Sequence, residues 1–166
     1  MKKTFIHSRS IFLLAVFLIL ISVGCQVKRQ ILAIGDKAPD FILSDLSGNK
    51  VSLTGSLKGK EILLNFWASW CSECRQEMPQ LDKFSKSYSH KIEIIGINIR
   101  ESKEQVVSFV NAEGISYKIL LDGRGKAAEL YGIVGVPTNV LINKDGLIKN
   151  RNLDVRQMES YLRQNN

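Results

Sequence analysis

The stretch that decides the fold is residues 67–79, Trp-Ala-Ser-Trp-Cys-Ser-Glu-Cys-Arg-Gln-Glu-Met-Pro, in which Cys71 and Cys74 follow an apolar run. The run from Glu61 to Trp67 predicts a strand buried on both faces of a sheet, and the residues after Cys74 predict a helix. Cys71 is therefore expected at a strand-to-helix junction, where free backbone amides and the helix dipole stabilise an anion. Because a thiolate is the nucleophile of disulfide exchange, this stretch predicts redox chemistry.

The spacing of Cys71 and Cys74 lets both sulfurs meet in one small ring, with the first thiol expected to be exposed and the second beneath it. Attack of Cys71 on a partner disulfide gives a mixed disulfide, from which Cys74 displaces the reduced partner. The alternative is half of a structural zinc site, which needs four protein ligands. Only Cys25, His7 and His90 remain as candidates. We therefore predict a redox pair with no metal and no other cofactor.

The N-terminus predicts export. Lys2, Lys3 and Arg9 precede an almost unbroken apolar run over residues 11–23, which is typical of an export segment. The uncharged stretch over residues 10–26 is slightly shorter than the ~20 apolar residues that a membrane-spanning helix needs.

Residues 21–25, Ile-Ser-Val-Gly-Cys, resemble a bacterial lipobox, with Ser22 where such signals usually have Leu. Three outcomes stay open: lipid attachment to Cys25 after cleavage, an uncleaved single-span anchor, and simple secretion. All three place the rest of the chain outside the cytoplasm. We expect an export signal or membrane anchor over 1–25, a tether over 26–35 and one folded domain over 36–166.

Composition and charge restrict the classes of partner. The chain has 166 residues, of which 45% are hydrophobic and 23% charged, as in ordinary globular domains. The net charge of +7 falls to +4 without residues 1–24, which hold three basic residues and no acidic one. Because the remaining basic residues are scattered, we expect a solvated surface, no nucleic-acid partner and a monomer.

Strands and helices are expected to alternate along the chain, which predicts an α/β domain. The expected strands cover residues 38–43, 50–53, 62–67, 92–99, 117–121, 138–142 and 147–150. A helix follows Cys74, and a second begins at a capping box of Ser102 and Gln105 and stops at Gly114. Two further helices are expected at residues 126–131 and from Asp154 onward.

The two residues between the cysteines are candidate tuning residues. Glu73 places a negative charge beside the thiolate, which is expected to raise the pKa of Cys71 and to favour a weakly oxidising, reductant-type couple. Ser72 is grouped with Glu73, although a small polar loop residue is its simpler interpretation.

Glu77 lies one helical turn after Cys74 and is a candidate for handling its proton. If the carboxyl group is partly buried, its pKa is raised and it can accept or donate that proton. An exposed helix glutamate is the alternative. Arg75 is expected to be a solvated side chain.

Residues 135–138, Gly-Val-Pro-Thr, are a second candidate element. A cis bond before Pro137 would aim the backbone of Val136 at a partner strand. Only about 5–6% of X-Pro bonds in folded proteins are cis, so the four residues alone favour the trans form.

Taken together, the segments Phe66-Trp67-Ala68-x-Trp70-Cys71-x-x-Cys74 and 135–138 resemble the thioredoxin fold. Residues 38–41 and 77–79 narrow the resemblance to membrane-anchored extracytoplasmic reductases of the ResA and TlpA type, within the AhpC/TSA-like sequence group, over about residues 34–164. The resemblance implies a central mixed sheet flanked by helices, with an N-terminal hairpin extension. It also implies that Cys71, Cys74 and Glu77 are catalytic. Substrate binding is implied for Trp70, Val136 and Pro137, with a cis bond before Pro137.

The chain departs from the thioredoxin pattern at two positions. Glu73 stands where such loops usually carry Pro before the second cysteine. Asn65 stands where cytosolic thioredoxins carry a buried aspartate. With no carboxylate at position 65, Glu77 becomes the better candidate for proton handling.

Reductases of this type reduce the haem-binding cysteines of apocytochrome c, and near relatives act in spore-envelope assembly or general thiol maintenance. The resemblance therefore implies exported protein disulfides as substrates and a membrane thiol-disulfide carrier as electron donor. The direction of the reaction stays open, because it depends on potential and partner.

Two other classes are alternatives. A peroxiredoxin would have Pro and then Thr or Ser at seven and three residues before the reactive cysteine, positions held here by Leu64 and Ala68. A copper- or haem-handling lipoprotein would favour cysteines separated by three residues and a distant histidine. Two residues separate the cysteines here, and His90 is the histidine of the expected domain.

Overall fold

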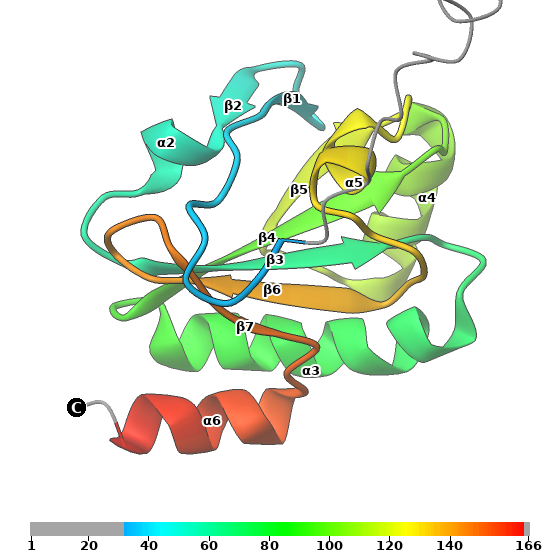
Figure 1. Cartoon of the computed structure of the whole chain (residues 1–166). Helices are drawn as coiled ribbons and strands as arrows, with labels where there is room; N and C mark the ends of the chain where they lie inside the picture. The colour runs from blue at the N-terminus through cyan, green and yellow to red at the C-terminus, as the bar shows by residue number, and fades with distance from the viewer. Residues whose placement is uncertain (1–31, 165–166) are drawn as a thin grey trace, which may run out of the picture.

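The sheet is built around β3 (Glu61–Trp67), in which every residue after Glu61 is buried. It pairs in parallel with β4 (Ile92–Ile99) and antiparallel with β6 (Thr138–Ile142). These observations come from a computed structural model that describes residues 32–164 (Figure 1). A strand with neighbours on both sides and helices on both faces has no polar surroundings, which explains its continuous apolar sequence.

The sheet has seven strands in the order β2-β1-β5-β4-β3-β6-β7. Next to β4, β5 (Lys118–Asp122) runs parallel, and β1 (Ile42–Asp45) and β2 (Lys50–Ser52) extend that side as an antiparallel hairpin. The other edge is β7 (Ile148–Arg151), antiparallel to β6. The predicted mixed sheet with an N-terminal hairpin is confirmed.

Helices cover both faces of the sheet. Alternate β3 residues face opposite ways, so Leu63 and Trp67 pack in one core cluster and Leu64 and Phe66 in the other. The first cluster includes side chains of α3 (Ser72–Tyr88), α4 (Lys103–Glu113) and α6 (Val155–Gln164), of which α3 and α6 lie side by side (Figure 1). The second includes side chains of α2 (Leu53–Ser56) and α5 (Lys126–Leu130).

The N-terminal hairpin differs from the prediction in where its strands lie. Residues 38–41 precede β1, and the N–H of Ala38 donates to the Gly146 carbonyl at 2.8 Å. β1 continues to Asp45, whose carboxylate accepts from the N–H groups of Ser47 and Asn49 and so closes the turn. The predicted second strand ends early because the Ser52 hydroxyl caps α2, a helix that was not predicted.

The other predicted elements lie within one residue of the observed ones at most ends. The capping box of Ser102 and Gln105 is present, and Gly114 ends α4 in the left-handed region at φ 64°. Glycine adopts that conformation without the steric cost that other residues meet.

The predictions for Cys25, for the export segment and for most of the tether concern residues 1–31, which lie outside the described residues. Among the helices of residues 32–164, none is long and apolar enough to cross a membrane.

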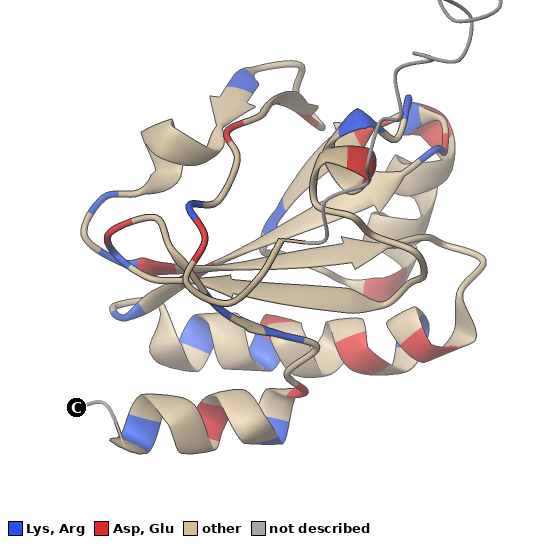
Figure 2. Ribbon diagram, viewed as in Figure 1, with Lys and Arg blue, Asp and Glu red and all other residues tan. Residues whose placement is uncertain are grey.

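Charged residues of both signs are interspersed over the visible ribbon (Figure 2). The first turn of α3 contains the acidic Glu73, and the last turn contains the basic Lys86. These two residues complement the helix dipole, which favours acidic groups near the N-terminus and basic groups near the C-terminus.

Replacing Ser102 with Ala tests the cap of α4. The Ser102→Ala variant loses the bond that the Gln105 N–H donates to the Ser102 hydroxyl and is expected to lose about 1 kcal/mol of unfolding free energy in urea. Ser108→Ala, which removes the same atom from an exposed position of α4, is the control and is expected to change stability by less than about 0.5 kcal/mol. Equal losses in the two variants would contradict the capping role.

Candidate active site

The two cysteines form a disulfide at the junction of β3 and α3, as predicted. Cys71 is the N-cap of α3, and its sulfur accepts the backbone N–H of Cys74 at 3.1 Å. The first turn of a helix leaves its N–H groups without helical acceptors, and the dipole there favours negative charge. The sulfur of Cys71 therefore occupies a place where a thiolate is stabilised.

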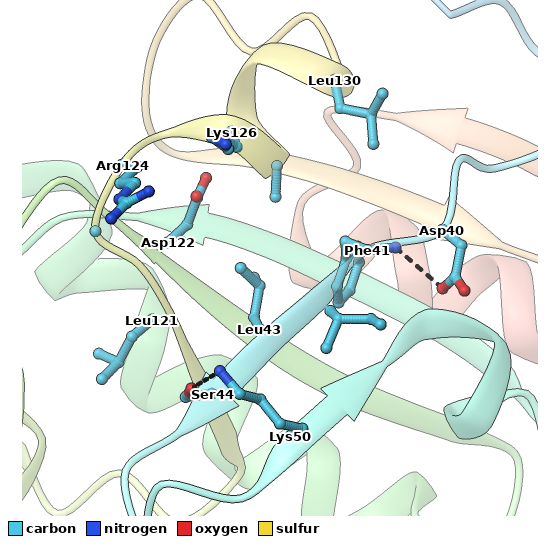
Figure 3. Close-up of a pocket in the computed structure, with 13 residues that line it drawn as sticks. Asp40, Phe41, Leu43, Ser44, Lys50, Leu121, Asp122, Arg124, Lys126 and Leu130 are labelled. Atoms are coloured by element: carbon cyan, nitrogen blue, oxygen red, sulfur yellow. Dashed lines mark hydrogen bonds between the residues drawn. The ribbon is translucent and has the colours of Figure 1, made fainter.

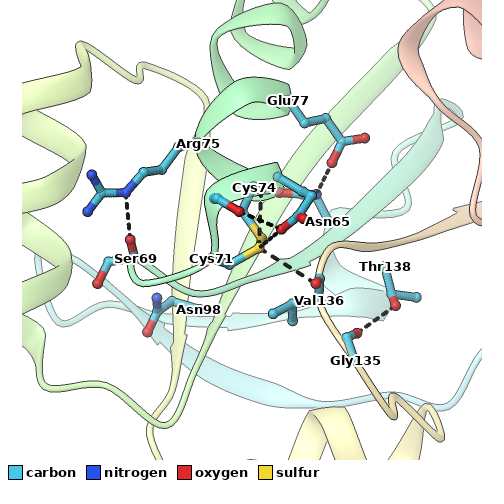
Figure 4. Close-up of a disulfide and its surroundings, with 12 residues drawn as sticks. Asn65, Ser69, Cys71, Cys74, Arg75, Glu77, Asn98, Gly135, Val136 and Thr138 are labelled. Atoms are coloured by element: carbon cyan, nitrogen blue, oxygen red, sulfur yellow. Dashed lines mark hydrogen bonds between the residues drawn. A yellow bond between two sulfur atoms is a disulfide. The ribbon is translucent and has the colours of Figure 1, made fainter.

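The first cysteine is less accessible than its sequence position predicted. Cys71 is 3% exposed and Cys74 is fully buried, so the expectation of an exposed first thiol is wrong. The reason is tertiary: the Val136 carbonyl lies 3.6 Å from the Cys71 sulfur and covers it from the loop before β6 (Figure 4). Trp70, directly before Cys71, turns outward and is 73% exposed.

The Val136–Pro137 bond is cis, as the resemblance implied. The structure places the backbone of Val136 beside the sulfur of Cys71, the residue that directly follows Trp70. The predicted substrate-binding residues Val136 and Pro137 therefore lie at the same site as Trp70. The Thr138 hydroxyl donates to the Gly135 carbonyl at 2.7 Å and closes the turn from the other side (Figure 4).

Glu73 faces the reactive sulfur. Its Oε2 lies 4.0 Å from the Cys71 sulfur and accepts from the Ser72 hydroxyl at 2.9 Å. The pKa of Glu73 is lowered, because its own backbone N–H and the Ser72 hydroxyl bind the carboxylate. The Ser72 hydroxyl therefore holds an ionised Glu73 carboxylate near the sulfur.

Glu77 is held beneath the surface by two buried amides. Asn139 Nδ2 donates to Glu77 Oε1 at 2.6 Å. Asn65 Nδ2 lies 3.4 Å from Oε2 (Figure 4). Asn65 Nδ2 also donates to Asn139 Oδ1 at 2.8 Å. The position where thioredoxins carry an aspartate therefore contacts the carboxylate of Glu77.

Burial raises the pKa of Glu77. Hydrogen bonds from Asn139 and Asn65 oppose this shift, and the negative charge of Asp154 adds to it. The carboxyl group lines a cavity of about 460 Å³ that Pro137 and Glu73 also line, so the cavity opens beside the disulfide. The alternative of a fully exposed helix glutamate is excluded by this half-buried position.

Asn139 is a site residue that the sequence reasoning missed. It stands opposite Asn65 in the antiparallel register of β3 and β6, and both are buried. An amide within each of two largely apolar strands was the signal available, because buried polar groups need partners.

Arg75 and Glu101 also belong to the site's surroundings. Arg75 is exposed, as expected of a solvated side chain. Its Nε also donates to the Ser69 carbonyl at 2.8 Å, and its guanidinium lies over the Phe109 ring, 5.4 Å from the centroid. Glu101 accepts from the N–H and the hydroxyl of Ser69. No local spacing signals these contacts, because Ser69 and Glu101 are separated by 32 residues.

A metal site at the cysteine pair has no support in the described part of the chain. No group of three or more His, Cys, Asp or Glu side chains there is arranged to hold a metal ion. His90 follows the far end of α3, whose 17 residues span about 26 Å. It therefore cannot join Cys71 and Cys74 around one ion.

A larger cavity, of about 510 Å³, lies between the N-terminal hairpin and α5 (Figure 3). Apolar side chains such as Phe41 and Leu121 line it, together with Lys50, Arg124 and Lys126. It shares no lining residue with the cavity beside the disulfide, so size alone does not mark the reactive centre.

Comparison with known proteins agrees with this site. A family model described as the AhpC/TSA family matches residues 34–151. The chain belongs to the AhpC/TSA family. The thioredoxin-like protein YneN of Bacillus subtilis is 41% identical over 118 residues, covering 69% of this chain and 68% of that protein. The thiol-disulfide oxidoreductase ResA of Bacillus thuringiensis is 35% identical over 144 residues, covering 84% and 83%.

A solved structure gives the same result for the fold. The thioredoxin domain of a thiol-disulfide oxidoreductase from Bacteroides vulgatus superposes with a TM-score of 0.73 at 29% identity, covering 80% of this chain and 97% of that one. With the disulfide at the start of α3, this member of the AhpC/TSA family is a thiol-disulfide oxidoreductase.

Membership of the AhpC/TSA family does not supply a peroxide pocket. Leu64 is buried in the core cluster opposite the one that holds the disulfide, and Ala68 is buried at the end of β3. Neither side chain carries the hydroxyl or ring that the peroxiredoxin pattern requires at these positions.

The raised pKa of Glu77 predicts a pH-dependent stability. The folded protein holds the Glu77 proton more tightly than the unfolded chain does. The contribution of Glu77 to the free energy of unfolding is therefore fully present below the unfolded pKa and is lost as the pH rises through the folded pKa. Across this pH window, the unfolding free energy of Glu77→Gln in urea is expected to rise relative to that of wild type. The rise is about 1.4 kcal/mol for each pH unit between the two pKa values. Glu113→Gln is the exposed control. A gap between Glu77→Gln and wild type that does not change with pH would contradict the burial effect.

Removing the charge of Glu73 tests its effect on the sulfur. Glu73→Gln is expected to lower the pKa of the Cys71 thiol in the reduced protein and to make the couple more oxidising. Because exposed charges are screened, the equilibrium constant with glutathione should change by less than about tenfold. Alkylation of samples equilibrated in glutathione buffers measures it, with Glu129→Gln on α5 as control. A more reducing Glu73→Gln couple would disprove the assigned sign.

Proposed function

We propose that the protein reduces disulfides in exported proteins, outside the cytoplasm and held at the membrane by its N-terminal segment. The observation that carries the proposal is the Cys71–Cys74 disulfide, whose first sulfur accepts an N–H of α3 and faces the Val136 carbonyl. The apolar residues 11–23 and the lipobox-like residues 21–25 support export and anchoring.

The reaction begins with both cysteines reduced. The Cys71 thiolate attacks one sulfur of the substrate disulfide, which breaks the substrate S–S bond and forms a mixed disulfide. The other substrate sulfur leaves as a thiolate and takes up a proton. Cys74 then loses its proton and attacks the Cys71 sulfur, which releases the second substrate thiol. Two electrons have passed to the substrate, and the Cys71–Cys74 disulfide remains.

Glu77 is proposed to handle the proton of Cys74 during the second attack. It lies one helical turn after Cys74, and burial raises its pKa above that of an exposed glutamate. The amides of Asn65 and Asn139 hold the carboxylate in place. A carboxyl group with a raised pKa binds a proton more tightly, which favours its action as a proton acceptor for Cys74.

The substrate and the electron donor are proposed from the resemblance to ResA-type reductases. Apocytochrome c is the proposed substrate, and a membrane thiol-disulfide carrier is the proposed donor that returns the pair to its reduced form. The Glu73 carboxylate beside the Cys71 sulfur supports the reducing direction, because negative charge destabilises the thiolate.

Trapping of mixed disulfides tests the proposal. A Cys74→Ser variant of the full chain, expressed in its native host, stops after the first attack and is expected to hold partners on Cys71, which mass spectrometry identifies. Cys71→Ser is the matched control and is expected to trap none through this site, because the attacking sulfur is gone.

The identity of the trapped partners decides the direction. Apocytochrome c or a membrane thiol carrier supports the proposed reductase. Recovery of cell-envelope substrates together with a quinone-linked oxidase would show that the same pair works as an oxidant.

A further inference from the structure

The loop that carries Trp70 and Cys71 is tied down at Ser69, two residues before the first cysteine. The backbone N–H of Ser69 donates to Glu101 Oε2 at 2.7 Å, and its hydroxyl donates to Oε1 at 2.5 Å. Its carbonyl accepts from Arg75 Nε at 2.8 Å (Figure 4). Every polar group of Ser69 is therefore bound to an element other than its own loop.

Glu101 is itself fixed at the ends of the neighbouring strands. Asn98, the buried penultimate residue of β4, donates from Nδ2 to Glu101 Oε2 at 2.6 Å. Arg100, directly before Glu101, adopts φ 58°, a left-handed conformation that few residues other than glycine adopt. Its N–H donates to the Asp122 carbonyl at the end of β5, at 3.1 Å. The carboxylate is thereby held where the loop after β4 turns toward α4.

Arg75 completes the arrangement from the first turns of α3. Its guanidinium lies over the Phe109 ring of α4, so the side chain bridges two helices while it binds the Ser69 carbonyl. Ser69 stands between an anion that accepts from its N–H and a cation that donates to its carbonyl. Hydrogen bonds to charged groups are roughly twice as strong as those between neutral groups.

Glu101 and Arg75 together form a clamp on Ser69. This clamp restrains the position of Trp70 more than it restrains the position of the Cys71 sulfur. Cys71 is held independently by its disulfide, by the Cys74 N–H and by the Val136 carbonyl. Trp70 is 73% exposed and has no place in either core cluster. Because Trp70 directly precedes the nearly buried Cys71 in the chain, we expect its exposed ring to contact a protein surface that reaches the sulfur.

We infer that Glu101 is a positioning residue for protein substrates. It acts through Ser69 to hold Trp70 in a fixed position relative to Cys71 and Val136. The inference rests on the proposed function, since it assigns Trp70 to partner docking. It separates two properties of the site: reactivity of the sulfur, set by α3 and the disulfide, and access for a folded partner, set by Glu101.

Two disulfide substrates of different size test this separation in the full-chain protein. The reduced Glu101→Gln variant is expected to reduce insulin about tenfold more slowly than wild type, because the loss of a charged acceptor weakens both bonds to Ser69. Its rate with hydroxyethyl disulfide and its equilibrium constant with glutathione should stay within about twofold. Glu104→Gln, the same charge change at an exposed position of α4, is the matched control and is expected to match wild type in all three.

A second variant removes one arm of the clamp. Ser69→Ala keeps the backbone N–H bond to Glu101 and loses only the hydroxyl bond, so a smaller loss confined to insulin is expected. It carries the test if Glu101→Gln fails to fold by circular dichroism. In the double variant, the loss should be less than the product of the two single losses, because both changes act on one contact.

Three results would overturn the inference. The first is a folded Glu101→Gln variant that reduces insulin as fast as Glu104→Gln does. The second is an equal loss of rate with insulin and with hydroxyethyl disulfide. The third is a Ser69→Ala variant that is indistinguishable from wild type. A wild-type protein that does not reduce insulin counts against the proposed function instead. The variant ratios are then measured in the oxidising direction, with the oxidised chain and a reduced protein dithiol, where the same split between large and small substrates is expected.

Discussion

The hydrogen bond from the Cys74 N–H to the Cys71 sulfur is the contact on which the site depends. It makes one atom serve two purposes, as the cap of a 17-residue helix and as the nucleophile of the reaction. The buried β3 determines where that helix can begin, because its last residue, Trp67, is locked in the core beneath α3 and α4. The positions of Glu73, Arg75 and Glu77 then follow from the turns of α3.

The second constraint is a carboxyl group that is only partly removed from water. Burying a carboxylate without partners is costly, and the amides of Asn65 and Asn139 offset that cost without abolishing it. The pKa of Glu77 is therefore raised, while the two amides keep its carboxyl group in a fixed orientation. In cytosolic thioredoxins, the buried carboxyl group belongs to an aspartate of the central strand. In this protein, β3 supplies the amide of Asn65 and α3 supplies the carboxyl group of Glu77.

The surroundings of the disulfide divide into two sides with different chemistry. On the side of β6 lie the Val136 carbonyl, 3.6 Å from the Cys71 sulfur, and the cavity that Pro137 and Glu77 line. On the side of α4 lie Glu101, Ser69 and Arg75, whose contacts concern the shape of the loop.

Sequence patterns alone determined the strands, most helices, the capping box at Ser102 and the reactive pair, because each depends on residues close together in the chain. Tertiary structure decided the burial of Cys71 beneath Val136, the pairing of Glu77 with Asn139 and the clamp between Ser69 and Glu101. These partners are separated by 65, 62 and 32 residues. They meet only because β3, β4 and β6 lie side by side, and strand order and register depend on long-range pairing that no local spacing specifies.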